Sequence, residues 1–314
     1  MNVIFMGTPD FSVPILRGLV EKGYNVKAVV TQPDRPKGRK KELTPPPVKS
    51  EALQHGLPVL QPETLKNEES VKEILELEPD LIITAAFGQI LPEAILTAPT
   101  YGAVNVHASL LPKYRGGAPI HQAVIDGEPT TGITIMYMVK KLDAGDILTQ
   151  RKIDIQKEDT TGSMHDKLSI AGRELLLETL PKLIRGDITP QPQNEKEATF
   201  ARNIKRGREK INWSAAAEAV YNHIRGMHPW PVAYTVYEDK PIKIWQAEAV
   251  EETAAAAPGT IARLDENGIW TTAGDGRLVL LTEVQPSGKK RMAAADYLRG
   301  KHGLEEGKRF SYDG

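Results

Sequence analysis

Asn105 and His107 are two polar side chains at the end of an apolar run, Gly102–Val106. Successive side chains of a strand point to opposite faces, so residues two apart emerge on the same side. An amide and an imidazole placed together can hold one reacting carbonyl group, because the amide donates a hydrogen bond to the carbonyl oxygen and the imidazole donates another or shuttles a proton. Considered without its flanks, the pair fits another interpretation better, namely an Asn that starts a turn and a hydrogen-bonded, partly buried His.

The segment after His107 favours the chemical interpretation. The apolar tripeptide Leu-Leu-Pro (110–112) stands inside a basic, glycine-containing loop that continues to Gly117. An exposed apolar loop costs solvation free energy, so a mere connection would not be expected to carry one. Apolar side chains beside free backbone groups suit a flat, partly apolar ligand.

Two carboxylates, Asp143 and Asp146, supply a third kind of group. They lie three positions apart between two apolar runs. One of them can reach His107, where it would set the tautomer of the imidazole or favour its charged form. Alternatively, both are turn residues that bond their own backbone. The spacing alone leaves both interpretations open.

A dense cluster of positive charge follows the apolar run 26–30. Five of the seven residues from 35 to 41 are basic, and a Pro and a Gly among them prevent a helix. Such a run is usually a solvated loop. Its position at the carboxyl end of an expected strand instead favours a polyanion that approaches the reaction centre. Two weaker basic clusters lie at 202–210 and 289–291.

The elements that must position these groups alternate between short apolar runs and helix-length amphipathic segments. Strands are expected at 3–6, 26–30, 57–60, 81–85 and 102–106, and helices up to about 22 and near 47–55, 68–76 and 92–96. This rhythm predicts an α/β domain with a Rossmann-like, mostly parallel sheet that is covered on both faces. Runs at 134–139 and 147–153 predict an antiparallel pair that closes the sheet, before a long helix at about 161–185. Ligands on such a sheet bind beyond the carboxyl ends of its strands.

The last third of the chain differs in kind. Residues 186–197 are polar, contain two prolines and show no apolar period, which is typical of a linker. A helix near 215–225 precedes short apolar runs separated by turn signals, at 233–237, 242–245, 259–264, 268–272 and 278–281. This pattern predicts a small, OB-like β-barrel. We therefore expect a catalytic domain at 1–189, a linker at 190–204 and a barrel domain at 205–314.

The composition excludes several classes of function. The 314 residues carry a formal net charge of −1, so any contact with nucleic acid must rely on local clusters. The chain has no cysteine, and its seven histidines form no metal-ligand pair, so no metal is expected. The turn Gly7–Asp10 lacks the glycine fingerprint of a nicotinamide site. No apolar run approaches the ~20 residues of a membrane helix and the start lacks signal-peptide features, so we expect a cytoplasmic protein with no membrane partner. Nothing in the sequence demands more than a monomer.

These segments together resemble the folate-dependent formyltransferases, and most closely the branch of that family that formylates charged tRNA. The matching stretches are FMGTPDF (5–11), TQPDRPKGRKKEL (31–43), NVHASLLPKYRGGAPI (105–120), LDAGDIL (142–148), HPWP (228–231) and PSGKKRM (286–292). The Asn-x-His-x-Ser-Leu-Leu-Pro block with a downstream Leu-Asp-x-Gly is highly specific for formyl transfer. The basic loop and the C-terminal barrel single out the tRNA branch. Ala108, Gly117 and the stretch 207–213 depart from the commonest forms without touching the central residues.

The resemblance implies a role for individual residues. Asn105, His107 and Asp143 match the catalytic trio of the family. The residues that match its folate-binding positions are Ser109, Leu110, Leu111, Pro112, Phe87 and Gly88. The basic residues expected to contact tRNA are Arg35, Lys37, Arg39, Lys40, Lys41, Arg206, Lys289 and Lys290. The implied formyl donor is 10-formyltetrahydrofolate as a co-substrate, and the implied acceptor is the free α-amino group of initiator methionyl-tRNA, which attacks the formyl carbon directly through a tetrahedral intermediate.

Two other functions remain as alternatives. The first is a formyltransferase whose acceptor is a small amine, such as a nucleotide-linked amino sugar or a purine precursor. The trio does not distinguish such an enzyme from one that formylates charged tRNA, whereas the basic loop and the second domain favour the tRNA substrate. The second is a non-catalytic RNA-binding protein on an inactive α/β scaffold, which the intact trio disfavours.

Overall fold

The computed structural model describes residues 1–38 and 40–311 and divides the chain into two compact units. The first unit comprises 1–119, 130–154 and 165–202. The second comprises 120–129, 155–164 and the chain from 203 onward. The expected boundaries were contiguous in sequence, whereas each compact unit gathers separate segments. Composition cannot reveal that residues 120–129 and 155–164 belong to the second unit, because they differ in no obvious way from their neighbours.

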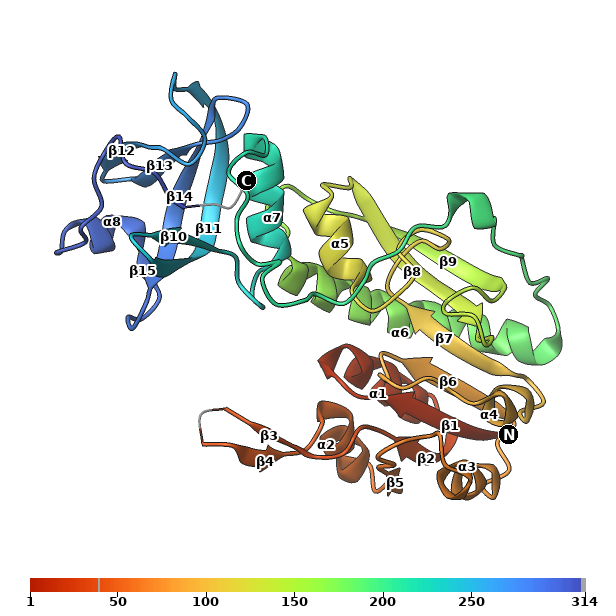
Figure 1. Ribbon diagram of the computed structural model, residues 1–314. Coiled ribbons are helices and arrows are strands. Elements are labelled where there is room, and N and C mark those ends of the chain that lie inside the picture. The colour runs from red at the N-terminus through yellow and green to blue at the C-terminus, as the bar shows by residue number, and fades with distance from the viewer. Residues whose placement is uncertain (39, 312–314) are drawn as a thin grey trace. The chain divides into compact units, whose positions relative to one another are not determined.

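The first unit is built on a seven-stranded sheet in the order β5-β2-β1-β6-β7-β8-β9 (Figure 1). The strands are β1 (Asn2–Gly7), β2 (Asn25–Val30), β5 (Val59–Leu60), β6 (Leu81–Ala85), β7 (Ala103–His107), β8 (Thr130–Tyr137) and β9 (Ile147–Asp154). The first five pair in parallel, and β8 and β9 pair antiparallel at one edge. The predicted mostly parallel, Rossmann-like sheet with a closing antiparallel pair is thus confirmed.

Helices cover this sheet. They are α1 (Val13–Glu21), α2 (Pro47–Gln54), α3 (Glu68–Leu75), α4 (Glu93–Thr97) and α6 (Thr161–Arg185), whose first residues belong to the second unit. On one face, Ile4 and Ile82 pack against a cluster that includes Ile74 of α3 and Ile95 of α4. Phe5 points to the opposite face and is equally buried. Each fully buried side chain of this size stabilises the fold by about 1.5–3 kcal/mol relative to an exposed one, which explains why these strands are uninterrupted apolar runs.

The neighbouring strands β6 and β7 carry polar residues toward their carboxyl ends. Thr84 of β6 lies opposite Asn105 of β7 in the parallel register. His107 is the last residue of β7 and lies opposite Thr134 of β8. The carboxyl end of the sheet therefore collects polar side chains beside an otherwise apolar core.

The basic segment forms a two-stranded hairpin apart from the main sheet (Figure 1). Its strands are β3 (Arg35–Lys37) and β4 (Glu42–Thr44), paired antiparallel. A loop was expected here; the structure instead pairs residues 35–37 with residues 42–44. Arg39, one of the residues expected to contact tRNA, lies outside the described residues.

The second unit contains a separate antiparallel sheet in the order β10-β11-β14-β13-β12, with β15 paired to β14. Its strands are β10 (Tyr234–Tyr237), β11 (Lys240–Thr253), β12 (Ile261–Asp265), β13 (Gly268–Thr272), β14 (Arg277–Pro286) and β15 (Met292–Ala293). Register shifts along β11 mark irregularities of the kind that bend a strand. This antiparallel domain agrees with the expected small barrel, although β11 is much longer than the predicted run 242–245.

Helices complete the core of the second unit. Helix α7 (Ala217–Gly226) contacts β11 and β14, and the short α8 (Ala294–Leu298) contacts β14. The fully buried Trp213 stacks on Phe310 at 5.8 Å between ring centroids. Helices α5 (Pro119–Ile125) and α8 were missed from the sequence because they are too short to show a helical period. Among the helices of the described chain, none is long and apolar enough to cross a membrane.

Candidate active site

The amide side chain of Asn105 lies toward the carboxyl edge of the sheet in the first unit. The hydroxyl of the buried Thr84 donates a hydrogen bond to Asn105 Oδ1 over 2.8 Å. Within the described chain, no protein group accepts a hydrogen bond from Asn105 Nδ2. Because the oxygen end of the amide is held, its two N–H groups remain available for an acceptor from outside the protein.

His107 is 6 % exposed and is held by the backbone of the following loop. Its Nε2 lies 3.0 Å from the carbonyl oxygen of Tyr114. A carbonyl oxygen only accepts hydrogen bonds, so Nε2 carries the proton. The other ring nitrogen, Nδ1, lies 3.9 Å from Asp143 Oδ2. The arrangement therefore leaves Nδ1 as the nitrogen that can gain or lose a proton beside a carboxylate.

Asp143 is the carboxylate that faces His107, whereas Asp146 makes no ion pair with that imidazole. The backbone N–H of Gly116 donates to Asp143 Oδ2 over 2.8 Å. Asp143 itself adopts a φ of 47°, a left-handed conformation that is uncommon outside glycine and typical of functional sites. At Gly145, a Cβ atom would lie 1.9 Å from the carbonyl oxygen of Tyr137, so only glycine allows this loop to approach β8 so closely.

The structure thus brings together the three residues expected to form the trio. Asn105 and His107 share one side of β7, and the loop between β8 and β9 places Asp143 next to His107. An amide donor, an imidazole and a carboxylate in this order can stabilise a negative charge on oxygen and move a proton. Among the described residues, no three His, Asp or Glu side chains are grouped as metal ligands.

The loop at Ser109, Leu110, Leu111 and Pro112 differs from the exposed apolar loop that was expected. Leu111 is 3 % exposed, and the side chain of Leu110 lies against β8. The backbone is also occupied: the carbonyl of Ser109 and the N–H of Leu111 bond the hydroxyl of Thr134, and the carbonyl of Pro112 accepts from the backbone of a later segment. A buried loop must satisfy its own polar groups, so the expectation of free backbone groups here was wrong.

Phe87 and Gly88 show a similar difference. The Phe87 ring belongs to a core cluster on one face of the sheet and is 4 % exposed, so it presents little surface to a ligand. The carbonyl of Phe87 accepts hydrogen bonds from Thr8 Oγ1 and Gln32 Nε2. Gly88 is exposed and has a φ of 91°. The backbone at Gly88 is therefore accessible to a ligand from outside.

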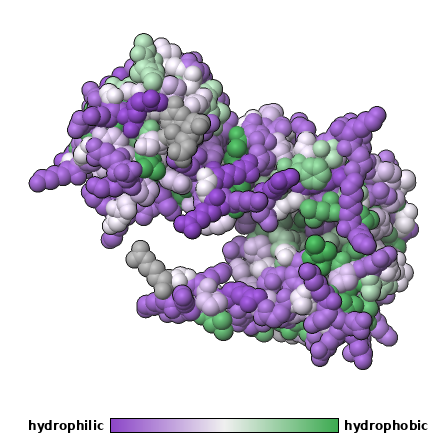
Figure 2. All heavy atoms as spheres, viewed as in Figure 1, coloured by the Kyte–Doolittle hydropathy of each residue, from purple (hydrophilic) through white to green (hydrophobic). Residues whose placement is uncertain are grey.

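Apolar side chains do reach the surface of the first unit. Figure 2 shows a mostly hydrophilic surface with separate apolar patches among the polar side chains. Ile90, just after Gly88, is 80 % exposed, and Leu142, next to Asp143, is 60 % exposed. These two segments therefore offer the apolar contact that the buried Leu111 and Phe87 do not.

The segment expected to be a linker is instead bound to the site loops. Thr199 accepts a hydrogen bond from the N–H of Tyr114 through its hydroxyl and exchanges backbone bonds with the same loop. At Gly116, whose φ is 118°, a Cβ atom would lie 2.6 Å from the carbonyl oxygen of Ala201. On the other side, Gln191 and Ile147 exchange both backbone hydrogen bonds. The sequence lacked an apolar period here because hydrogen bonds, rather than apolar packing, hold the segment.

Arg115 is fully buried between these segments and was not identified from the sequence. Its guanidinium donates to the side chains of Gln193 and Glu195. The hydrogen bonds that Arg115 and Lys141 donate to Glu195 lower the pKa of its carboxyl to about 2. The pair fixes the loop that carries the hydrogen-bond partners of His107 and Asp143.

The Glu195 pair predicts a pH-dependent contribution to stability. The folded pKa lies below the ordinary value of 4.5, so the contribution is present above about pH 4.5 and is lost as the pH falls toward 2. The melting temperature of the wild type should therefore exceed that of Glu195→Gln at pH 6, and the difference should shrink between pH 4.5 and 2. Because Glu195 is half exposed, added salt should reduce the difference. A difference in melting temperature that stays constant between pH 6 and pH 2 would refute the assignment.

The expected tRNA contacts divide into two groups. Arg35 forms an ion pair with Glu63 at 2.6 Å. Within the described chain, no ion pair engages Lys37, Lys40 or Lys41, and all three are exposed. In the second unit, Arg206, Lys289 and Lys290 are exposed, and the ammonium of Lys289 lies 5.2 Å from the ring centre of Tyr297. The free lysines of the hairpin are the clearest candidates for phosphate contacts.

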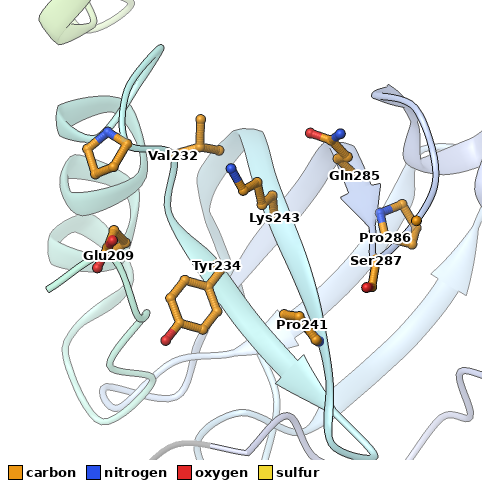
Figure 3. Close-up of a pocket in the computed structure, with 10 residues that line it drawn as sticks. Glu209, Val232, Tyr234, Pro241, Lys243, Gln285, Pro286 and Ser287 are labelled. Carbon is orange, nitrogen blue, oxygen red and sulfur yellow. The ribbon is translucent and has the colours of Figure 1, made fainter. Parts of the chain in front are cut away.

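A cavity of about 360 Å³ lies in the second unit and was not expected from the sequence (Figure 3). Its lining combines prolines with Tyr234, Lys243 and Gln285. The Gln285 side chain is already engaged, since it accepts from Trp245 Nε1 and donates to the carbonyl of Lys289. None of the trio lines this cavity, so its chemistry is separate from that of the candidate site.

Comparison with known proteins identifies the family. The formyl transferase family profile matches residues 1–180, and the profile of the formyl transferase C-terminal domain matches 203–302. The methionyl-tRNA formyltransferase of Geobacillus sp. (strain WCH70) is 59 % identical over 300 residues, which cover 96 % of this chain and 94 % of that protein. The methionyl-tRNA formyltransferase of Bacillus subtilis (strain 168) is 56 % identical over 301 residues, with 96 % and 95 % covered.

Solved structures share the fold at low identity. WlaRD, a sugar 3N-formyl transferase crystallised in the presence of dTDP and 5-N-formyl-THF, gives a TM-score of 0.68 at 16 % identity, with 92 % of this chain and 99 % of that chain covered. HypX from Aquifex aeolicus in complex with tetrahydrofolic acid gives 0.65 at 18 % identity, with 99 % and 50 % covered. With relatives above 55 % identity across nearly the full chain and both family profiles matched, the chain belongs to the formyltransferase family, in the branch of the methionyl-tRNA formyltransferases.

Proposed function

We propose that this enzyme transfers the formyl group of 10-formyltetrahydrofolate to the α-amino group of methionine carried on initiator tRNA. The identity of 56–59 % to the methionyl-tRNA formyltransferases described above supports these two substrates. The observation that carries the chemistry is the convergence of Asn105, His107 and Asp143 at the carboxyl end of β7. No covalent enzyme nucleophile is needed, because the amine itself attacks the formyl carbon.

Asn105 has the role of an oxyanion donor in this mechanism. When the amine nitrogen bonds to the formyl carbon, the carbonyl electron pair moves onto oxygen. Asn105 Nδ2 then donates to that oxygen, while Thr84 holds the other end of the amide. A donor that is oriented before the reaction stabilises the developing charge without reorganisation, and one such donor is worth about 2.7–4 kcal/mol.

His107 and Asp143 have the role of moving the proton. The attacking nitrogen must lose one proton, and the departing folate nitrogen must gain one. His107 Nδ1 takes up the first proton, because Nε2 is already protonated and bonded to Tyr114. Asp143 stabilises the resulting imidazolium from 3.9 Å. The electron pair on oxygen then re-forms the carbonyl as the old carbon–nitrogen bond breaks. The departing folate nitrogen takes the proton from His107, which releases tetrahydrofolate and the formylated amine.

We assign the folate co-substrate to exposed groups beside the trio and after the neighbouring strand β6. The unpartnered Asn105 Nδ2 suits the formyl oxygen, the exposed backbone at Gly88 can bond a polar ring edge, and Ile90 and Leu142 offer apolar contact. We assign the loop at Ser109–Pro112 to supporting the folate-binding region, chiefly through the packing of Leu110 and Leu111 against the protein. We further propose a cytoplasmic monomer that requires no metal.

A formylation assay tests the proposal directly. The enzyme is given 10-formyltetrahydrofolate with labelled formyl, and three acceptors are compared: charged initiator tRNA, a nucleotide-linked amino sugar and a purine precursor amine. We expect label on the charged tRNA only. Label on a small amine at comparable kcat/KM would assign the chain to the first alternative, and tRNA binding without any transfer of label would support the non-catalytic one.

A further inference from the structure

Gln193 lies in the segment that the sequence presented as a linker, and its side chain bridges the two loops of the site. Resting on the proposed function, we propose that Gln193 is a positioning residue for formyl transfer, which holds Asp143 opposite His107. Its Nε2 lies 2.9 Å from the carbonyl oxygen of Asp143 and 2.7 Å from that of Gly145. Both hydrogen bonds act on the turn that carries the carboxylate.

The partners of Gln193 fix which way its amide faces. A guanidinium can only donate, so Gln193 Oε1 must face Arg115, whose Nε and Nη2 lie 3.1 and 2.8 Å away. The N–H groups must then face the two carbonyls. Both ends of this half-buried amide thus have hydrogen-bond partners, so the side chain connects Arg115 to the turn rigidly.

The turn at Asp143 needs such a connection. Asp143 is held in a left-handed conformation, and its neighbour Leu142 is exposed, so little apolar packing supports this part of the turn. The Gly116 N–H orients the carboxylate from the opposite loop. Gln193 ties the backbone of the turn to Arg115, the residue that directly precedes Gly116. Gln193 therefore ties the backbone of the turn to this loop, in addition to the hydrogen bond by which Gly116 orients the carboxylate.

The hydrogen bonds between Gln193 and Arg115 also influence the orientation of His107. Tyr114, which accepts the hydrogen bond of His107 Nε2, directly precedes Arg115. Holding Arg115 by Gln193 fixes the loop from which both members of the proton-transfer pair take their orientation. A displacement of about 1 Å in a catalytic geometry can cost about 10²-fold in rate, so a residue that touches no substrate can still control turnover.

The test is the variant Gln193→Met, which keeps the length of the side chain and removes both of its hydrogen-bonding ends. We expect kcat for formylation of charged tRNA to fall about 10- to 100-fold, with KM for the folate and for the tRNA within about twofold. The matched control is Gln191→Met on the same segment, whose exposed side chain bonds only the carbonyl of Thr189. The control should keep wild-type kcat, and a Gln193→Met enzyme with wild-type kcat would overturn the proposal.

Two further variants separate positioning from general destabilisation. Gln193→Glu keeps an acceptor for Arg115 but turns a carboxylate oxygen toward the two carbonyls of the turn, so it should lose kcat at least as strongly as Gln193→Met. Melting temperatures measured beside kcat separate loss of turnover from loss of folded enzyme. Against an Asp143→Asn background, Gln193→Met should cost little more, because its effect acts through the carboxylate that is already gone. Equal losses in both backgrounds, or full activity of Gln193→Glu, would show a merely structural role.

The failure of this proposal is distinct from the failure of the proposed function. If charged tRNA is not formylated by the wild type, the function is wrong. If the wild type is active and His107→Ala is inactive while Gln193→Met is normal, the function holds and the positioning role falls.

Discussion

Replacement of His107 by alanine is expected to lower kcat for formyl transfer by about 10²–10⁴-fold, the range that a positioned proton-transfer group contributes. The dissociation constant of the folate should remain within about twofold, because the imidazole is 6 % exposed and is held by the backbone of Tyr114. Asp143→Asn should cause a loss of similar order, since a neutral amide cannot stabilise an imidazolium at Nδ1. Single-turnover kinetics with labelled formyl donor, together with folate binding by calorimetry, measure the two effects separately.

His165→Ala is the matched control for this prediction. His165 is partly exposed on α6, and its imidazole pairs with the exposed Asp166 rather than with any residue of the site. The control variant should retain normal turnover. If His107→Ala also retained near-normal turnover, the imidazole would have no place in the mechanism, and the role of the trio would have to be given up.

The local part of this site could be predicted from the sequence because it depends on strand geometry. Two residues at alternate positions of one strand must share a face, so the spacing of Asn105 and His107 was enough to place them together. The apolar runs identified the central strands because parallel strands buried on both faces are nearly continuous in apolar residues. The position of the site at the carboxyl edge then followed from the topology.

The long-range part could not be predicted. Whether Asp143 or Asp146 faces His107 depends on one turn that is shaped by Gly145 and by its contact with Tyr137, and no local pattern encodes that contact. The segment 190–204 was expected to be a linker because much of its order comes from hydrogen bonds to loops more than 40 positions away in sequence. Apolar periodicity reports packing, so it cannot reveal an element that is held by polar contacts.

The side chains of the loop after β7 show the opposite error. Leu-Leu-Pro was interpreted as a ligand surface because an apolar loop is costly in water. The structure avoids that cost by burying Leu111 and by packing Leu110 against β8. The physical premise was right, but burial against the protein satisfies it as well as burial against a ligand does.

Neutralising the basic hairpin should change how the reaction depends on salt. The variant carries alanine at Lys37, Lys40 and Lys41, three exposed lysines that no carboxylate of the described chain pairs. Each phosphate contact contributes about 0.7–0.9 to the slope of log affinity against log salt, so the slope should flatten by about 2. At low salt, kcat/KM for charged tRNA should fall by about 10- to 100-fold, while kcat at saturating tRNA should change little, since the trio is untouched.

A second triple variant separates local contact from overall charge. Alanine at Lys22, Lys27 and Lys66 removes the same net charge from other exposed positions of the first unit. If long-range attraction alone recruits the tRNA, both variants should lose affinity equally, and the hairpin would be no phosphate contact. If the hairpin binds the acceptor arm directly, only its own variant should flatten the salt slope. An unchanged slope in both would favour a small amine acceptor, because such a substrate releases few counterions on binding.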